Sequence, residues 1–245
     1  MSLLFIGEGR EYLLRPGETL ETDLGILEVP EDVKAGETVE THLGTEFVAR
    51  QLRGPDLFHH FERTGAPMMP RDIGLVMGHT GIKQDDRVLD AGTGTGVLAA
   101  SLGRTGATVL TYERDPEFAT VARENMTLAG VSETVEVRVG DVTSELDDLA
   151  AEEEAFDLIT LDTEDAPAVV ERAPDLLGPA GFIAVYSPFV EATSEVVKTA
   201  RKAGLEDVES LETIQREMDV GERGTRPSTA GVGHTGYLTF ARNPV

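Results

Sequence analysis

One stretch indicates the fold of this chain: Val88-Leu-Asp-Ala-Gly-Thr-Gly-Thr-Gly-Val-Leu-Ala-Ala-Ser-Leu-Gly103. A short apolar run ends at Asp90, glycines then alternate with threonines, and an Ala/Leu-rich run follows. This order predicts a buried strand, a tight turn and a helix, which together form a nucleotide-binding corner. The turn reads Gly-x-Gly-x-Gly, and no Gly-Lys-Ser/Thr follows it, so a P-loop is excluded and a dinucleotide fingerprint is weakened.

Downstream of about residue 70, strand-like and helix-like patterns alternate along the chain. Repeated strand–helix units predict a mostly parallel, Rossmann-like α/β sheet with helices on both faces. The last two strand candidates have no helical pattern between them, which predicts an antiparallel hairpin at the edge of the sheet. The expected strands span 87–91, 108–113, 135–140, 156–161, 181–187, 208–214 and 236–241, and the expected helices include 116–129, 166–177 and 191–203.

The first 55 residues have a different pattern, with short alternating segments separated by turn signals such as Pro16-Gly17. Period-two alternation at a spacing of about ten residues predicts a small antiparallel sheet or barrel. Residues 55–66 have the composition of a short helical connector. We therefore expect a β-rich N-terminal domain with its connector over residues 1–66 and a larger α/β domain over residues 67–245.

The composition limits the partners and the compartment. The chain has no cysteine, so disulfides and thiolate metal sites are excluded, and no apolar run approaches the length of a membrane span. The N-terminus lacks the features of a signal peptide, which predicts a cytoplasmic protein. The net charge of −24 normally argues against nucleic-acid partners. However, only four of the 21 basic residues are lysines, and an acidic, lysine-poor composition is typical of salt-loving organisms, where salt screens the charge.

Carboxylates stand where successive strands of the predicted sheet end. Glu113 lies about twenty residues beyond the first glycine, where an acid accepts hydrogen bonds from a ribose diol. Asp141 follows the third strand, where it can accept from the amino group of an adenine, and Asp162 follows the fourth. Open α/β sheets bind ligands at this carboxyl edge. The series predicts a nucleotide-binding sheet rather than an α/β domain without a ligand.

Here the chain resembles the class I S-adenosylmethionine (AdoMet)-dependent methyltransferases. Within that class it is similar to the tRNA (adenine-N1-)methyltransferases that modify the T-loop, over nearly its whole length. The most specific part of the resemblance is the closing motif, Arg226-Pro followed by His234-Thr-Gly-Tyr-Leu-Thr-Phe-Ala-Arg242. Thr41–Phe47, Met69–Leu75 and Gly81–Gly92 also follow the family pattern.

The resemblance implies AdoMet as the methyl donor and tRNA as the partner. It assigns Glu113 to the ribose, Asp141 with Val142 to the adenine of the donor, and Asp162 to the reaction centre. A carboxylate at position 162 would accept a hydrogen bond from the N6 amino group of the target adenine and favour the cation formed at N1. The other donor-binding residues that it implies are Asp90, Gly92, Gly94, Thr95, Gly96 and Val97.

The resemblance also implies a homotetramer and no metal requirement. Arginines must meet the tRNA phosphates, and the candidates are Arg53, Arg63, Arg71, Arg223 and Arg226. The chain departs from the family after Asp162, where Thr163–Pro167 replaces a Pro-Glu/Gln-Pro-like stretch, and at Met69, where an aromatic residue is common. Both departures concern the substrate side rather than the donor side.

Two alternatives remain at this point. The first is a carboxyl methyltransferase of the isoaspartyl-repair type, which shares the glycine corner but has no need for the N-terminal β region or the His234–Tyr237 ending. The second is a non-catalytic tRNA-binding subunit, which the intact glycine turn, Glu113 and Asp162 disfavour. His234 is expected to pack at a subunit interface or to face the substrate, and Tyr237 and Phe240 are expected to fill the core.

Overall fold

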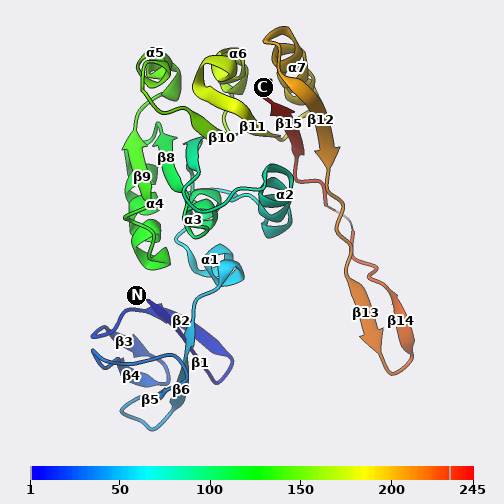
Figure 1. Ribbon diagram of the computed structural model, residues 1–245. Helices are drawn as coiled ribbons and strands as arrows, with labels where there is room; N and C mark the ends of the chain where they lie inside the picture. The colour runs from blue at the N-terminus through cyan, green and yellow to red at the C-terminus, as the bar shows by residue number, and fades with distance from the viewer. Residues whose placement is uncertain (1, 232) are drawn as a thin grey trace.

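The computed structural model describes residues 2–231 and 233–245, and a seven-stranded sheet forms its centre (Figure 1). The strand order is β12-β15-β11-β10-β7-β8-β9. The five strands from β11 to β9 pair in parallel, and β15 runs antiparallel to both of its neighbours. This confirms the mostly parallel Rossmann-like sheet. The strands are β7 (Arg87–Ala91), β8 (Thr108–Glu113), β9 (Val135–Val139), β10 (Phe156–Leu161), β11 (Leu177–Ser187), β12 (Glu206–Glu212) and β15 (Tyr237–Arg242).

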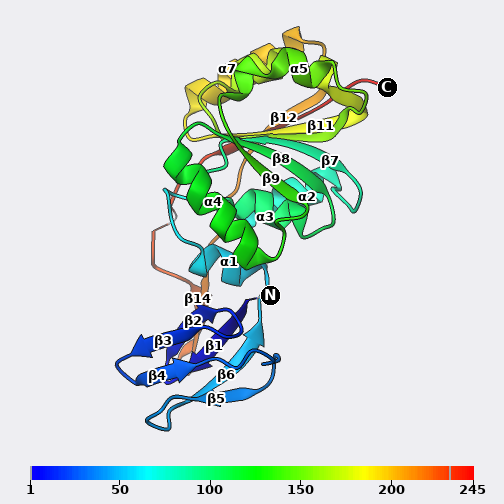
Figure 2. The ribbon, with the colours of Figure 1, turned by 90° about the vertical axis from the view of Figure 1, so that its left-hand side faces the viewer.

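Helices cover both faces of this sheet, as Figure 2 shows. One face carries α2 (Pro70–Thr80), α3 (Val97–Gly103) and α4 (Pro116–Ala129), and their apolar sides form one core with the sheet. The other face carries α5 (Leu146–Ala150), α6 (Ala166–Leu176) and α7 (Val190–Lys202), with a second core, and a single 3-10 turn, η1 (Val142–Ser144), precedes α5. None of the helices in the described part of the chain is long and apolar enough to cross a membrane.

Local sequence signals explain the bounds of these helices. Asp115 caps α4 by accepting hydrogen bonds from the N–H groups of Glu117 and Phe118, and Pro116 occupies the first helical position. The same helix ends at Gly130, which adopts a left-handed conformation. These signals placed the expected helix 116–129 correctly.

The last two expected strands form an antiparallel pair at one edge of the sheet, as expected. They are β12, which is the edge strand, and β15, which lies between β12 and β11. Between β12 and β15 the chain leaves the sheet as a two-stranded ribbon, β13 (Met218–Gly221) and β14 (Gly224–Pro227), which projects away from the body (Figure 1). We expected a loop here. The ribbon was missed because every residue in it is exposed, so its sequence has no apolar face to reveal strands.

One strand boundary also needs correction. β11 begins at Leu177 rather than at residue 181, because Leu177 pairs with Phe156 before the register shifts. Leu177 was assigned to the preceding helix because its apolar side chain continues the helical pattern. Extended backbone at Leu177 ends α6 at Leu176 instead.

The N-terminal part is β-rich, as expected. A four-stranded antiparallel sheet has the order β2-β1-β6-β5, and a separate hairpin, β3 with β4, packs against it around a third core. The connector is helical only over α1 (Gly54–His60), because Phe61 turns to an extended conformation. We retain the division at residue 66 as a proposal. The strands are β1 (Leu3–Gly7), β2 (Arg10–Leu14), β3 (Thr19–Thr22), β4 (Gly25–Glu28), β5 (Thr38–Glu40) and β6 (Glu46–Gln51).

Candidate active site

The glycine turn after β7 brings two distant segments into close contact. Gly92 has a φ of 90°, and a β-carbon there would overlap the carbonyl oxygen of Asp162. Gly96 has a φ of 82°, and a β-carbon there would strike the side chain of Met126 on α4. Only glycine combines these conformations with such close approach. The turn therefore lies directly against the end of β10 and against α4.

Asp90 is buried beneath this turn. Its carboxylate accepts hydrogen bonds from the hydroxyl groups of Thr111 on β8 and Thr160 on β10. Burial raises the pKa of Asp90, although both hydroxyl donors act in the opposite direction. The hydroxyl groups of Thr93 and Thr111 are also in hydrogen-bond contact. These contacts tie three adjacent strand ends together, so Asp90 builds the floor of the site.

Glu113, at the end of β8, is held by backbone groups. Its carboxylate accepts the N–H of Gly94 at 2.8 Å and the N–H of Asp115 at 3.1 Å. A carboxylate has about four lone-pair positions, so two remain for further donors. The arrangement fits a ribose diol, which offers two hydroxyl donors.

Asp141, after β9, forms a similar arrangement. One oxygen accepts both the N–H and the hydroxyl group of Thr143, at 2.9 and 2.7 Å. The hydrogen bond from the Thr143 side chain is the main cause that lowers the pKa of Asp141, so the group is ionised at neutral pH. The second oxygen can accept from an amino group. Val142, the next residue, is buried and lines the same space.

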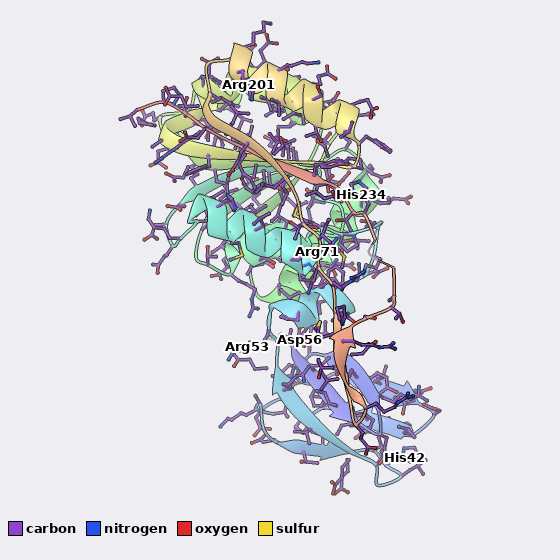
Figure 3. All side chains as sticks on the ribbon, turned by 90° about the vertical axis from the view of Figure 1, so that its right-hand side faces the viewer. His42, Arg53, Asp56, Arg71, Arg201 and His234 are labelled. Atoms are coloured by element: carbon purple, nitrogen blue, oxygen red, sulfur yellow. The ribbon has the colours of Figure 1, made fainter. Side chains whose placement is uncertain are left out.

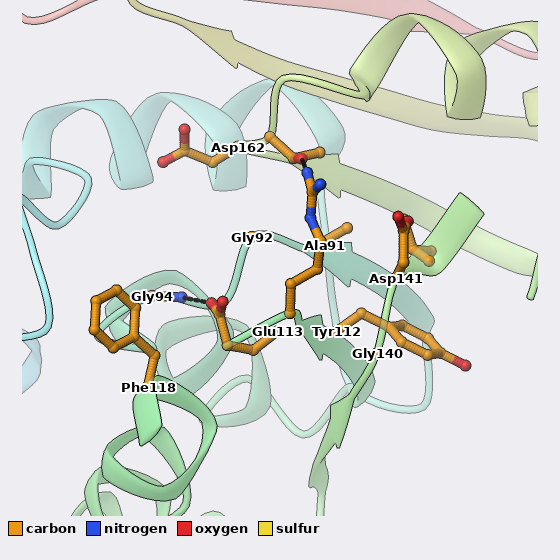
Figure 4. Close-up of a pocket in the computed structure, with 12 residues that line it drawn as sticks. Ala91, Gly92, Gly94, Tyr112, Glu113, Phe118, Gly140, Asp141 and Asp162 are labelled. Atoms are coloured by element: carbon orange, nitrogen blue, oxygen red, sulfur yellow. Dashed lines mark hydrogen bonds between the residues drawn. The ribbon is translucent and has the colours of Figure 1, made fainter. Parts of the chain in front are cut away.

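A cavity of about 280 Å³ opens along this edge of the sheet, and we call it the main cleft (Figure 4). It brings together six of the predicted donor-binding residues. A smaller hollow of about 40 Å³ adjoins it, next to residues 66–68, and is lined by the other four, Asp90, Thr95, Gly96 and Val97. Those lining the main cleft are Gly92, Gly94, Glu113, Asp141, Val142 and Asp162.

Asp162 lines both the main cleft and the smaller hollow. In Figure 4 its carboxyl group points away from Asp141, on the other side of the cleft. Protein atoms surround the carboxyl group. This burial is the main cause, and the charge of Asp90 the second, that raises the pKa of Asp162 to about 7. The side chain nevertheless remains solvent-accessible. Water therefore offsets part of the effect of burial.

A polar cluster lies near Asp162, outside the lining of the main cleft. The hydroxyl of Tyr186, at the end of β11, donates to the carbonyl of Thr235 at 2.6 Å. Burial and then the charge of Asp162 raise the pKa of Tyr186, so the phenol stays protonated. Arg71, at the start of α2, donates to the hydroxyl of Thr235 at 2.8 Å, and the neighbouring Asp72 is buried. The closing motif thus packs against α2 beside Asp162.

The predicted arginines do not form one surface. Arg53 and Arg63 are exposed at the two ends of the α1 connector, and Arg223 and Arg226 are exposed on the β13–β14 ribbon. Arg71 is mostly enclosed and is engaged with Thr235. Figure 3 shows Arg53 below α1 and Arg71 farther up, beside the sheet. The prediction that these residues bind RNA stays a prediction.

His234 is exposed, and its ring is held by contacts within the chain. Its ring contacts Glu212 at 2.7 Å through Nδ1 and the carbonyl of Pro188 at 3.1 Å through Nε2. The hydrogen bond to Glu212 is the main cause that raises the pKa of His234. Tyr237 lies against its ring with a centroid separation of 4.9 Å and is only half-buried, so it does not fill the core as expected. Phe240 is buried, as expected.

Several lining residues were missed by the sequence analysis. Tyr112 and Arg114 flank Glu113, and Thr163 follows Asp162, so their proximity in sequence was an available signal. Tyr186, the next-to-last residue of the fifth strand in the series, lies outside the lining of the main cleft but was equally detectable. Phe118 gave no signal, because only the fold turns α4 toward the main cleft. Within the described residues, no three or more His, Asp or Glu side chains are grouped to hold a metal ion. The absence of a metal requirement stays a prediction.

Comparison with known proteins places this geometry in context. The family described as "tRNA methyltransferase complex GCD14 subunit" matches residues 61–225. A tRNA (adenine(57)-N(1)/adenine(58)-N(1))-methyltransferase, TrmI, of Methanocaldococcus jannaschii is 34% identical over 273 residues. That alignment covers 99% of this chain and 94% of the relative.

Solved structures resemble the whole chain, including its N-terminal β region. A SAM-dependent O-methyltransferase from Thermotoga maritima matches with a TM-score of 0.80 and 25% identity, covering 100% of this chain and 93% of the other. The tRNA (m1A58) methyltransferase TrmI from Aquifex aeolicus matches with a TM-score of 0.71 and 21% identity, covering 99% and 96%. The second likeness concerns the fold alone.

Proposed function

Because the chain belongs to the tRNA methyltransferase family described as the GCD14 subunit, we propose that it methylates N1 of a T-loop adenine in tRNA, with AdoMet as the methyl donor. The target adenine lies in the 57/58 region named for the archaeal relative. The observation that carries the proposal is the position of Asp162, which faces a cleft at the same sheet edge as Glu113 and Asp141.

The residues of the main cleft fit the donor. Glu113, held by the N–H of Gly94, would accept from the ribose hydroxyl groups with its two remaining lone-pair positions. Asp141, held by Thr143, would accept from the adenine amino group beside Val142. The glycine turn and the hollow next to residues 66–68 would receive the methionine part. When bound, AdoMet supplies a methyl group on a positively charged sulfur. The task left to the protein is alignment and control of charge.

Asp162 acts on the acceptor. As a carboxylate it accepts a hydrogen bond from the N6 amino group of the target adenine, which directs electron density toward N1. The same negative charge stabilises the cationic ring that methylation produces. A group that faces the place where charge develops contributes about 10²- to 10³-fold in rate in comparable sites. Tyr186 lies next to Asp162 as a protonated phenol and supplies a wall of the base pocket.

The target adenine must leave its stack to reach this pocket, at a cost of a few kcal/mol. Contacts from arginines to the tRNA phosphates offset this cost. The exposed candidates for these contacts are Arg53, Arg63, Arg223 and Arg226. The β-rich N-terminal part carries further docking surface. Arg71 instead supports the closing motif through Thr235.

We also propose a homotetramer that works in the cytoplasm at high salt. The β13–β14 ribbon supports the oligomer, because its apolar side chains Met218 and Val220 are 53% and 79% exposed. An isolated two-stranded ribbon is marginally stable, so a neighbouring subunit supplies its missing packing. Sedimentation of the wild type and of Val220→Asp tests this: we expect a tetramer for the wild type and dissociation for the variant. A monomeric wild type would refute it.

The activity test uses labelled AdoMet at high salt with two acceptors, unmodified tRNA and an isoaspartyl peptide. Label should enter tRNA as 1-methyladenosine, and mapping of the modified positions should place it in the T-loop. Label in the peptide instead would establish the carboxyl methyltransferase. Binding of AdoMet with no transfer to either acceptor would point to a non-catalytic tRNA-binding subunit.

A further inference from the structure

Arg114 reaches across the edge of the sheet. It follows Glu113 at the end of β8, yet its Nη2 lies 3.2 Å from the hydroxyl of Thr163 and 2.5 Å from a carboxylate oxygen of Asp165. Glu164 lies 3.7 Å from the same nitrogen. These partners belong to the loop between β10 and α6, which is the segment whose sequence departs from the family pattern.

The path of this side chain crosses the main cleft. β7 separates β8 from β10 in the sheet, so a side chain joining their ends must pass over the end of β7. Arg114 and Thr163 both line the main cleft, together with Gly92 at the end of β7. The bridge therefore spans the opening rather than lying beside it.

Asp165 is available for this bridge. It occupies the N-cap position of α6, but its side chain makes no capping hydrogen bond. Its carboxylate is therefore committed to Arg114 rather than to the helix. Arg114 is also close enough to Asp141 for its positive charge to lower the pKa of that group. The guanidinium thus lies between two acids, Asp165 on one side of the cleft and Asp141 on the other.

We propose that Arg114, bridged to Thr163 and Asp165, is a strap that retains the nucleoside part of the methyl donor and steadies the loop that begins at Asp162. This inference rests on the proposed function, because it takes AdoMet as the occupant of the main cleft. Exposed ion pairs contribute little, so the strap opens readily for exchange. The planar guanidinium presents a flat face that suits an aromatic ring beneath it.

The strap makes donor release sensitive to salt. Screening weakens an exposed ion pair as ionic strength rises, so release from the wild type should accelerate with salt. Arg114→Gln and Asp165→Asn remove the attraction, so release should be about two- to fivefold faster at low salt and nearly independent of salt. Asp165→Glu keeps the charge and should restore slow, salt-dependent release.

The experiment measures dissociation of labelled AdoMet by competition with unlabelled AdoMet at several salt concentrations. Arg172→Gln is the matched control, because Arg172 forms similar exposed ion pairs with Asp147 and Asp175 away from the cleft. Its release rate should equal that of the wild type. Melting curves identify any variant that fails to fold, and Asp165→Asn, which removes no helix cap, then carries the test.

The outcomes separate the strap from the proposed function. If the wild type binds AdoMet and both neutral variants release it at the wild-type rate and with the wild-type salt dependence, the strap is refuted while the function stands. If Arg172→Gln accelerates release equally, the effect is general electrostatics and the strap is again refuted. If the wild type does not bind AdoMet at all, the proposed function fails and the strap fails with it.

Discussion

Gly92 lies against the backbone of Asp162 so closely that no β-carbon fits between them. The N–H of Asp162 also donates to the carbonyl of Ala91 at 2.9 Å. The glycine turn after β7 and the loop that begins at Asp162 after β10 are therefore one packed unit. A substitution that displaces the glycine turn should therefore also displace the loop that begins at Asp162.

Gly92→Ala should abolish methyl transfer and weaken AdoMet binding strongly, because the new methyl group displaces the Asp162 backbone. Gly36→Ala is the matched control: its φ of 95° is similar, but a β-carbon there meets nothing within 4 Å. Both variants carry the backbone strain of about 1 kcal/mol or more, and only the first carries the overlap. Calorimetric binding of AdoMet and the tRNA assay distinguish them. Equal losses in both variants would contradict the packed unit.

Glu113→Gln should weaken AdoMet binding by about tenfold or more, because charge-assisted hydrogen bonds to a ribose contribute roughly 1.5–3 kcal/mol. The amide also adds a donor that faces the N–H of Gly94 or Asp115, which both now point at carboxylate oxygens. Glu117→Gln, on the neighbouring helix, is the control. Equilibrium binding measures the effect, and an unchanged Kd for Glu113→Gln would remove this residue from the ribose site.

Asp162→Ala should leave the Kd for AdoMet within a few-fold of wild type while lowering kcat by about 10²-fold or more. The physical reason is that its carboxylate lies on the acceptor side of the cleft, away from Asp141. Single-turnover methylation of tRNA separates this effect from product release. A kcat close to wild type would show that Asp162 does not act in the reaction.

The pH dependence of the methylation rate should follow the ionisation of the Asp162 carboxyl group. The active form is the carboxylate, and burial and Asp90 raise its pKa to about 7. The rate should therefore rise with pH through about 7 and level off above it, falling about tenfold per pH unit well below the pKa. A profile of kcat/KM for tRNA checks this. A rate that is flat between about pH 5.5 and 8.5 would contradict the assignment.

The same shift makes a prediction about stability. Because the pKa of Asp162 in the folded chain exceeds the unfolded value of 3.8, the folded state binds the proton more tightly. Its contribution is full below pH 3.8 and is lost as the pH rises through about 7. Asp162→Asn, which cannot ionise, should therefore gain in Tm relative to the wild type as the pH rises from about 5.5 to 8.5.

The sequence predicted which acids meet at the edge of the sheet. Glu113, Asp141 and Asp162 follow or end successive strands, and parallel topology brings these strand ends into one cleft. Tyr186 is the next-to-last residue of the following strand and extends the same logic. The exposed β13–β14 ribbon could not be predicted, since no core-facing pattern marks it.

Local sequence was enough to predict the alternating strands and helices of the central sheet, the glycine turn and the acids at the sheet edge, because these depend on local periodicity and on the chirality of strand–helix units. Only the tertiary structure decided that Asp90 lies beneath the turn bonded to two threonines, that Arg71 is enclosed by the closing motif, and that Arg114 spans the main cleft to Asp165. Each of these contacts joins residues far apart in the chain. Their distances follow from packing of the whole sheet, which no local pattern encodes.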